Sequence, residues 1–264
     1  MSPLETEHFF RTSDRIRLHY KNAGQGERSL VFIPGWLMPA EVFRYQCRDL
    51  SQDHQVVVLD PRGQGLSQVP ARGMSAQRRA RDIHELLQRL ELTRYVLIGW
   101  SLGVMEVLEA LMSHPMPGLQ GLVLIDNSIG MASPPAAATR RLRPMGRGPF
   151  ARYVQEFSRA IFKRAPADDL LHAVERSARL LPPVAAWRLL GQRPPREFYR
   201  QAVLSSSVPL WYAITPRYRP QAEELLQTRT GASVSVYEDA GHALFVDRDQ
   251  DFNADLRRFL SRLP

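Results

Sequence analysis

Short uninterrupted runs of hydrophobic residues alternate along the chain with longer stretches in which hydrophobic positions recur every three or four residues. The uninterrupted runs predict strands buried on both faces, and the longer stretches predict helices. This alternation predicts a mostly parallel sheet with helices on both faces, an α/β fold. The predicted strands span residues 16–21, 29–33, 55–60, 95–98, 121–126, 208–214 and 232–237, and the clearest helices span 41–50, 76–92 and 104–112.

The alternation stops between residues 127 and 207, where helical stretches occur without an intervening strand. Pairs of prolines separate these helical stretches, and proline ends a helix because it lacks the backbone N–H. The pattern predicts a helical cap at 127–207, inserted into an α/β core formed by 1–126 and 208–264.

One pentapeptide, Gly99-Trp100-Ser101-Leu102-Gly103, lies directly between a predicted strand and a predicted helix. It has the form G-x-S-x-G, which at such a turn is typical of a nucleophile elbow. The flanking glycines leave room for a turn so tight that the serine hydroxyl projects above the sheet edge. The string is common by chance, so its position after a strand carries the argument. Ser101 is the candidate nucleophile.

Composition is ordinary for a globular protein, with 44% hydrophobic and 23% charged residues among 264. No hydrophobic run approaches the roughly 18 residues of a membrane span. The acidic N-terminal stretch lacks the hydrophobic segment of a secretory signal. The single cysteine, Cys47, leaves no internal disulfide. These features predict a cytoplasmic protein that does not associate with a membrane.

Three further stretches join the elbow in a familiar order: Ile33-Pro34-Gly35-Trp36, Asp60 to Ser67 with the pattern D-x-R-G-x-G-x-S, and Ala240-Gly241-His242. Together they resemble the motifs of the α/β-hydrolase fold family, and the resemblance spans nearly the whole chain outside the predicted cap. It implies the α/β-hydrolase fold and a serine hydrolase that cleaves carboxylic esters through an acyl-enzyme.

A serine hydroxyl needs an adjacent base to act as a nucleophile, and an imidazole serves near neutral pH. His242 is the candidate base, because it follows the last predicted strand, where this fold delivers one. The other histidines lie in early segments, in predicted helices or in the cap. A loop histidine without chemistry is the alternative for His242.

The third member of the triad departs from the family pattern. The loop after the predicted strand 208–214 usually carries the acid, but residues 215–220 contain no carboxylate. Asp126, at the end of the preceding strand, is the candidate instead, since some relatives place the acid there. Asp126 as a turn cap remains an alternative, with Glu238 and Asp239 as less favoured acids. Asp60 is expected to organise the turn that follows it.

The resemblance assigns the oxyanion hole to the backbone amides of Trp36 and Leu102. Pro34 stands where the family more often has a histidine that braces this loop, so the stiffness of the loop is in question. Trp36 and Trp100 are expected either to wall a hydrophobic substrate pocket or to be ordinary core residues. The sequence leaves these alternatives open.

The positive charge is concentrated in the predicted cap. Residues 139–200 hold fourteen basic and five acidic side chains, whereas the rest of the chain holds 21 and 22. Such a surplus can steer an acidic partner. The elbow string also resembles that of the esterase acting on pimeloyl-carrier-protein methyl ester, so docking of an acyl carrier protein is one hypothesis, with solubility as the alternative. The candidate docking residues are Arg140, Arg141, Arg143, Arg147 and Arg152.

Other functions find no support in the sequence. Residues 63–65 lack the remaining glycine of a dinucleotide-binding motif, and no phosphate loop or metal-ligand spacing occurs. No cofactor or metal is expected, and no nucleic-acid-binding pattern accompanies the basic charge. Two hypotheses stand beside an esterase for small-molecule esters: the carrier-linked esterase and a non-catalytic relative that binds a ligand or partner. The same triad also serves thioester, lactone, amide and carbon–carbon cleavage.

Overall fold

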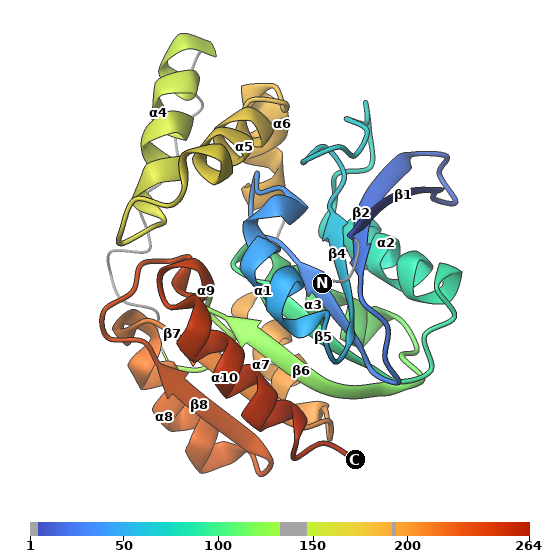
Figure 1. The fold of residues 1–264 in the computed structure, drawn as a ribbon, viewed down its shortest axis with the longest axis vertical. Helices are drawn as coiled ribbons and strands as arrows, with labels where there is room; N and C mark the ends of the chain where they lie inside the picture. The colour runs from blue at the N-terminus through green and yellow to red at the C-terminus, as the bar shows by residue number, and fades with distance from the viewer. Residues whose placement is uncertain (1–4, 133–146, 192–193) are drawn as a thin grey trace.

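A computed structural model describes residues 5–132, 147–191 and 194–264. Within these ranges the chain forms an eight-stranded sheet with the order β1-β2-β4-β3-β5-β6-β7-β8 (Figure 1). β1 and β4 each pair antiparallel with β2, and all other neighbours are parallel. The strands are β1 Thr6–Arg11, β2 Arg17–Ala23, β3 Ser29–Ile33, β4 Gln55–Asp60, β5 Tyr95–Trp100, β6 Leu119–Ile125, β7 Leu210–Ile214 and β8 Ala232–Val236.

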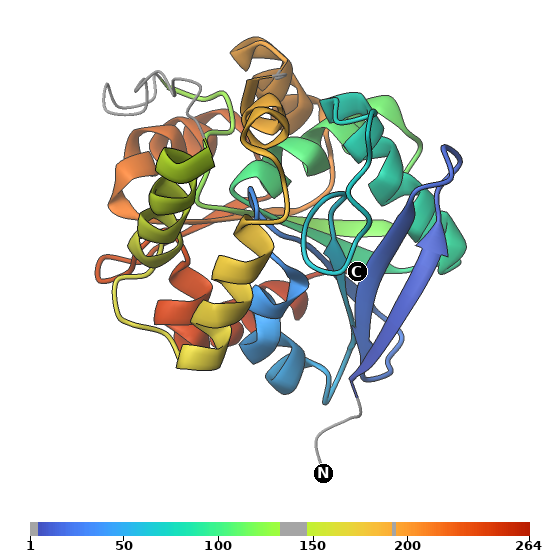
Figure 2. The ribbon, with the colours of Figure 1, turned by 90° about the horizontal axis from the view of Figure 1, so that it is seen from above.

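Helices cover both faces of the sheet, as the views of Figures 1 and 2 agree. α1, α9 and α10 lie on one face, and α2, α3, α7 and α8 lie on the other. This double cover explains why β3, β5 and β7 are buried at every position. Their bounds are α1 Arg44–Leu50, α2 Ala76–Arg89, α3 Leu102–Ser113, α7 Arg196–Ser205, α8 Arg219–Thr228, α9 Leu244–Asp247 and α10 Asp249–Leu260, with 3₁₀ turns η1 Ala40–Phe43 and η3 Pro216–Tyr218.

The α/β fold predicted from the hydrophobic pattern is confirmed. Each predicted strand corresponds to one in the structure within a few residues, but the pattern did not predict β1. Only one of the six residues of β1 is buried, because this strand forms the edge of the sheet. An exposed edge strand has no hydrophobic face, so it leaves no periodic signal in the sequence.

Three helices stand apart from the two helical layers. They are α4 Arg147–Ala160, α5 Asp168–Ala178 and α6 Pro183–Gly191, which we call the cap helices. Figure 2 looks down on them and shows that they lie over one end of the sheet. α7, the last helix before β7, packs instead against α3 in the core. The predicted bounds of the cap, 127 and 207, stay a prediction.

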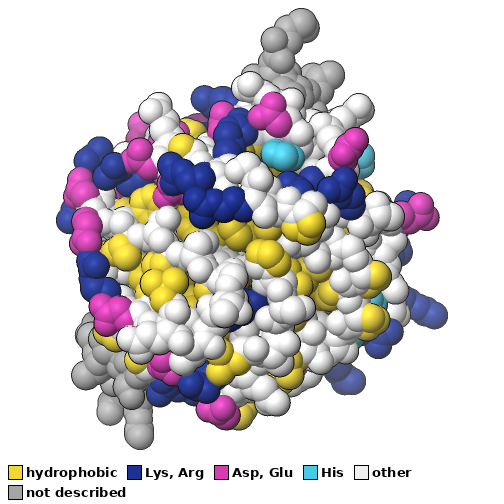
Figure 3. Space-filling view, turned by 90° about the horizontal axis from the view of Figure 1, so that it is seen from below, with side chains coloured by type: hydrophobic (Ala, Val, Ile, Leu, Met, Phe, Trp, Pro, Cys, Tyr) yellow, Lys and Arg dark blue, Asp and Glu magenta, His cyan; other side chains and the backbone are white. Residues whose placement is uncertain are grey.

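The face of the molecule opposite the cap helices is shown in Figure 3. Hydrophobic side chains lie across its middle, and charged side chains of both signs surround them. Exposed hydrophobic side chains are normal on a globular surface, so this face alone indicates no function. Among the helices that the structure describes, none is both long enough and hydrophobic enough to cross a membrane.

Candidate active site

Ser101 lies at the turn between β5 and α3, with φ 54° and ψ −117°. L-residues rarely adopt such a backbone, and strain of this kind is typical of functional sites. The flanking glycines permit the turn: a Cβ on Gly103 would lie 2.2 Å from the carbonyl oxygen of Ile33. A Cβ on Gly99 would lie 2.6 Å from the carbonyl oxygen of Gly103. Ser101 itself remains partly exposed.

Asp126 and His242 form a hydrogen-bonded pair across 116 residues of sequence. Nδ1 of His242 lies 2.7 Å from Oδ2 of Asp126. Because a carboxylate only accepts, Nδ1–H is the donor, and a neutral ring keeps its lone pair on Nε2. The side chain of Asp126 is 3% exposed and that of His242 is 28% exposed. The carboxylate is therefore shielded, while the ring is accessible from solvent.

Thr215 supports the same carboxylate from the loop after β7. Its backbone N–H and its hydroxyl donate to Oδ1 of Asp126 at 2.8 and 2.6 Å. The other oxygen, Oδ2, faces His242, so both oxygens of Asp126 are engaged. The loop that carries the acid in the common pattern therefore supplies here a donor to the Asp126 carboxylate.

Asn127 connects this carboxylate's loop to the elbow. Its Nδ2–H donates to the carbonyl oxygen of Ser101 at 2.5 Å, and its Oδ1 accepts from the N–H of Ser128 at 2.8 Å. The hydroxyl of Tyr212 donates to the carbonyl oxygen of Asn127 at 2.7 Å. Burial raises the pKa of Tyr212 well above its ordinary value, which keeps this hydroxyl a donor. In this turn the side chain of Asn127 bonds to Ser128, whereas the side chain of Asp126 bonds to Thr215 and His242.

The loop after β3 approaches Ser101 so closely that a Cβ on Gly35 would lie 2.9 Å from the Cβ of Ser101. Gln64 holds this loop in place. Its Oε1 accepts from the N–H of Leu37 at 2.7 Å, and its Nε2 donates to the carbonyl oxygens of Gly35 and Met38 at 3.0 and 3.1 Å. A buried carboxamide thus braces the loop in which proline replaces the family's histidine.

Trp36 and Leu102 carry the two amides that the resemblance assigns to the oxyanion hole. Leu102 is the first residue of α3, so its N–H has no acceptor within the helix. Trp36 follows the glycine that approaches Ser101 and precedes Leu37, whose φ is 64°. Within the described ranges, five non-glycine residues have a positive φ, and three of them, Leu37, Ser101 and Asp126, lie in this site.

The two tryptophans beside Ser101 have different surroundings. Trp36 faces the cap helices: its indole N–H donates to the carbonyl oxygen of Ala186 at 2.8 Å, and its ring stacks on Trp187 with 5.2 Å between centroids. Trp100 supports the loop of His242: its indole N–H donates to the backbone carbonyl oxygen of His242 at 2.9 Å. The other cap rings in contact with Trp36 are Tyr153 and Phe157.

A second histidine–carboxylate pair lies in the core. Nδ1 of His19 is 2.7 Å from Oδ2 of Asp60, and both side chains are buried, at 0% and 3% exposure. The His19 ring packs against Phe9, and Asp60 also accepts from the N–H of Leu66 at 2.8 Å. Asp60 also accepts from the backbone N–H of Ala40, so this pair organises the turn after β4, as the sequence predicts for Asp60.

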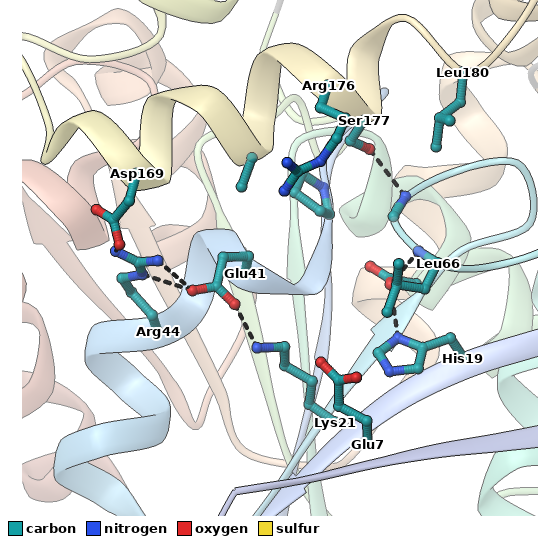
Figure 4. Close-up of a pocket in the computed structure, with 14 residues that line it drawn as sticks. Glu7, His19, Lys21, Glu41, Arg44, Leu66, Asp169, Arg176, Ser177 and Leu180 are labelled. Atoms are coloured by element: carbon teal, nitrogen blue, oxygen red, sulfur yellow. Dashed lines mark hydrogen bonds and ion pairs between the residues drawn. The ribbon is translucent and has the colours of Figure 1, made fainter.

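A cavity of about 440 Å³ lies beside this second pair, between the core and α5 (Figure 4). Glu41 on its wall accepts hydrogen bonds from Lys21 and Arg44, and Arg44 also donates to Asp169 of α5 at 2.7 Å. Figure 4 shows these charges pointing toward one another. They compensate one another and connect α5 to the core, and the cavity is lined by residues other than those around Ser101.

The five candidate docking arginines are only partly covered by the structure. Arg140, Arg141 and Arg143 lie outside the described residues. Arg147 is the first residue of α4, and Arg152 is exposed on the same helix.

A family model described as the alpha/beta hydrolase family matches residues 30–255. The chain belongs to the alpha/beta hydrolase family. This match covers the elbow, Asp126 and the loop of His242.

Two curated relatives of this alpha/beta hydrolase match over part of the chain. Serine hydrolase BPHL from Homo sapiens is 34% identical over 105 residues, which is 38% of this chain and 36% of the relative. N-formylmaleamate deformylase from Pseudomonas putida is 34% identical over 116 residues, which is 44% of this chain and 43% of the relative. The chain therefore matches less than half the length of either relative.

Among solved structures, an esterase (EaEST) from Exiguobacterium antarcticum superposes with a TM-score of 0.78 at 20% identity. The superposition covers 96% of this chain and 98% of the esterase. At this identity the likeness shows the fold.

Three residues that support the site were not predicted. Gln64 lies within the D-x-R-G-x-G-x-S motif, which points to a turn but not to the loop that Gln64 braces. For Thr215 the sequence offered one signal of a role in the site, namely that its loop lacks the usual carboxylate. Asn127 had none, because an asparagine after a strand is an ordinary turn residue.

Proposed function

We propose that this alpha/beta hydrolase is a serine esterase in which Ser101 is the nucleophile, His242 the base and Asp126 the orienting acid. One observation carries the proposal. The Asp126–His242 pair, with 2.7 Å between Nδ1 and Oδ2, joins the loops after β6 and β8 at the same edge of the parallel sheet at which β5 presents Ser101. Ligands bind at this edge of parallel sheets.

The reaction begins when Oγ of Ser101 attacks the ester carbonyl carbon while Nε2 of His242 takes the hydroxyl proton of Ser101. Asp126 stabilises the imidazolium through Nδ1–H, and the amides of Trp36 and Leu102 bind the oxyanion. Collapse of the tetrahedral intermediate breaks the bond to the alcohol, which leaves with the proton from His242. Water, activated by the same imidazole, then releases the acid and restores the serine.

The aromatic rings above Trp36 support esters with small or medium hydrophobic acyl groups as substrates. The backbone N–H of Trp36 is one of the two proposed oxyanion donors, and the stack of its ring with Trp187 places the cap helix α6 directly above the loop. The names of the similar proteins, a serine hydrolase and an esterase, agree with ester hydrolysis. The deformylase name is why an amide bond is included in the test below.

The test is hydrolysis of p-nitrophenyl butyrate, p-nitrophenyl octanoate and p-nitrobutyranilide by the purified protein, with rates expressed per titrated active site. We expect burst release with the esters and loss of turnover in Ser101→Ala. Asp126→Asn is expected to lower kcat by about 10⁴-fold, as for an orienting acid that fixes the tautomer. Asp60→Asn is the matched control, because it breaks the other histidine–carboxylate pair. Full turnover in Ser101→Ala would contradict the proposal.

A second candidate, hydrolysis of esters carried by an acyl carrier protein, is supported by the charge surplus of residues 139–200 and by the exposure of Arg152. Electrostatic docking accelerates association and weakens with salt. Neutralising Arg140, Arg141 and Arg143 is then expected to lower kcat/KM for a carrier-linked ester while p-nitrophenyl butyrate hydrolysis is unchanged. Equal effects on both substrates would remove this candidate.

A further inference from the structure

Asp247, the last residue of α9, connects the loop of His242 to the segment that follows cap helix α4. Its Oδ2 accepts from the N–H of Gly241, the residue before His242, at 2.8 Å. The N–H of Lys163 lies 2.9 Å from Oδ2 and 3.1 Å from Oδ1, and the N–H of Arg164 lies 3.2 Å from Oδ1. One carboxylate therefore binds backbone amides from two segments far apart in the sequence.

The same two segments also meet on the other side of His242. The N–H of Ala243 donates to the carbonyl oxygen of Ile161 at 2.8 Å. A Cβ on Gly241 would lie 2.7 Å from both that carbonyl oxygen and the nitrogen of Lys163. The residues before and after His242 are thus both held against residues 161–163. A shift of the His242 backbone would therefore strain these contacts to residues 161–163.

Hydrogen bonds to an ionised acceptor are stronger than those between neutral groups, so the Asp247 carboxylate fixes these amides more firmly than a neutral side chain would. A second link between the segments, the ion pair of Arg164 and Asp239 at 2.9 Å, lies on the surface with 67% and 53% of its side chains exposed. Exposed pairs contribute little. Of these two side-chain links between the segments, Asp247 therefore contributes more to holding the loop.

We propose that Asp247 is a positioning residue that holds His242 in register with Ser101 by tying its loop to residues 161–164. The proposal rests on the proposed function, because it assumes that His242 is the base. A displacement of about 1 Å at a reacting group can reduce the rate by about 100-fold. The residues after α4 therefore set the position of the base, and changes there alter kcat without touching the triad.

The test compares Asp247→Ala, Asp247→Asn and Asp247→Glu with Asp239→Asn as the matched control. kcat and KM for p-nitrophenyl butyrate are measured per titrated active site, together with Tm. We expect kcat of Asp247→Ala to fall by roughly 10- to 100-fold, with KM changed by less than about threefold. Asp247→Asn keeps one acceptor oxygen, so its kcat is expected to fall less than that of Asp247→Ala. Asp247→Glu keeps the carboxylate and is expected to have a higher kcat than Asp247→Ala. Asp239→Asn is expected to match the wild type.

A merely structural role would lower Tm and the number of titratable sites but leave kcat per site unchanged. That result for Asp247→Ala would overturn the proposal, as would an equal loss of kcat in Asp239→Asn. If Asp247→Ala does not fold, the Asn and Glu variants test the proposal instead. Unchanged kcat per site in Asp247→Asn would then overturn it. Activity that survives in Ser101→Ala would contradict the proposed function separately, whatever the order of the Asp247 variants.

Discussion

Thr215 donates two hydrogen bonds to the oxygen of Asp126 that faces away from His242, at 2.8 Å from its N–H and 2.6 Å from its hydroxyl. Two adjacent strand ends, after β6 and β7, thus supply the Asp126 carboxylate and the donors that support it. The carboxylate stands one strand earlier than in the common pattern, yet it reaches the same ring nitrogen. The hydroxyl of Thr215 therefore helps to hold the carboxylate in the orientation in which its other oxygen faces His242.

The first prediction concerns this hydroxyl. Thr215→Val keeps the shape and the backbone N–H but removes the hydroxyl donor to Asp126. Because a hydrogen bond to a charged group contributes about 1.5–3 kcal/mol, we expect kcat/KM to fall by roughly 10- to 100-fold. The measurement is p-nitrophenyl ester hydrolysis per titrated site. Thr215→Ser is the control and should stay near the wild type, and equal rates in the Val and Ser variants would remove the role assigned to the hydroxyl.

The sequence predicted the parts of the site that follow from the order of strands. Ser101, Asp126 and His242 each follow a hydrophobic run, and strands of one parallel sheet end at the same edge, so their proximity could be anticipated. The supporting contacts of Gln64 and Asp247 could not, because each joins a side chain to backbone amides of a distant loop. Such contacts depend on loop conformation, which leaves no periodic pattern in the sequence.

The second prediction separates the two histidine–carboxylate pairs. Asp60→Asn weakens the contact to His19 and leaves buried groups without their charged partner. Breaking a buried pair typically costs about 3–5 kcal/mol, so Tm should fall by roughly 10 °C in a protein of this size. kcat per titrated site should change by less than about tenfold, in contrast to Asp126→Asn. Thermal melting gives Tm, and ester hydrolysis per titrated site gives kcat. If Asp60→Asn lowered kcat more than Asp126→Asn does, the roles of the two pairs would be exchanged.

The third prediction concerns the attachment of the cap helices. Trp36→Phe removes the indole N–H that donates to the buried carbonyl oxygen of Ala186, which costs about 1–3 kcal/mol. Trp187→Phe is the matched control, because it keeps an aromatic ring in the stack while its buried indole N–H has no hydrogen-bond partner in the structure. Urea denaturation should therefore show a clear decrease in the free energy of unfolding for Trp36→Phe and a smaller decrease for Trp187→Phe. Equal losses would indicate that ring packing, not the hydrogen bond, attaches α6.

The last prediction concerns the stability of the protein at acidic pH. His84 of α2 and His114 at the end of α3 stack with 4.7 Å between ring centroids and 11° between their planes. Burial lowers the pKa of His114 below its ordinary value of 6.5, and the charges of His84 and Arg81 lower it further. The unfolded chain therefore binds the proton more tightly than the folded one.

It follows that the stability contributed by a neutral His114 is fully present above pH 6.5 and is lost as the pH falls through the lowered pKa. His114→Asn removes this titration. We expect the urea midpoint of the wild type to fall more steeply than that of the variant as the pH is lowered below 6.5, and the two curves to run parallel above it. The test is to measure the urea midpoint of both proteins from pH 8 to pH 5. If the two curves of midpoint against pH ran parallel throughout, protonation of His114 would not destabilise the packing of α2 on α3.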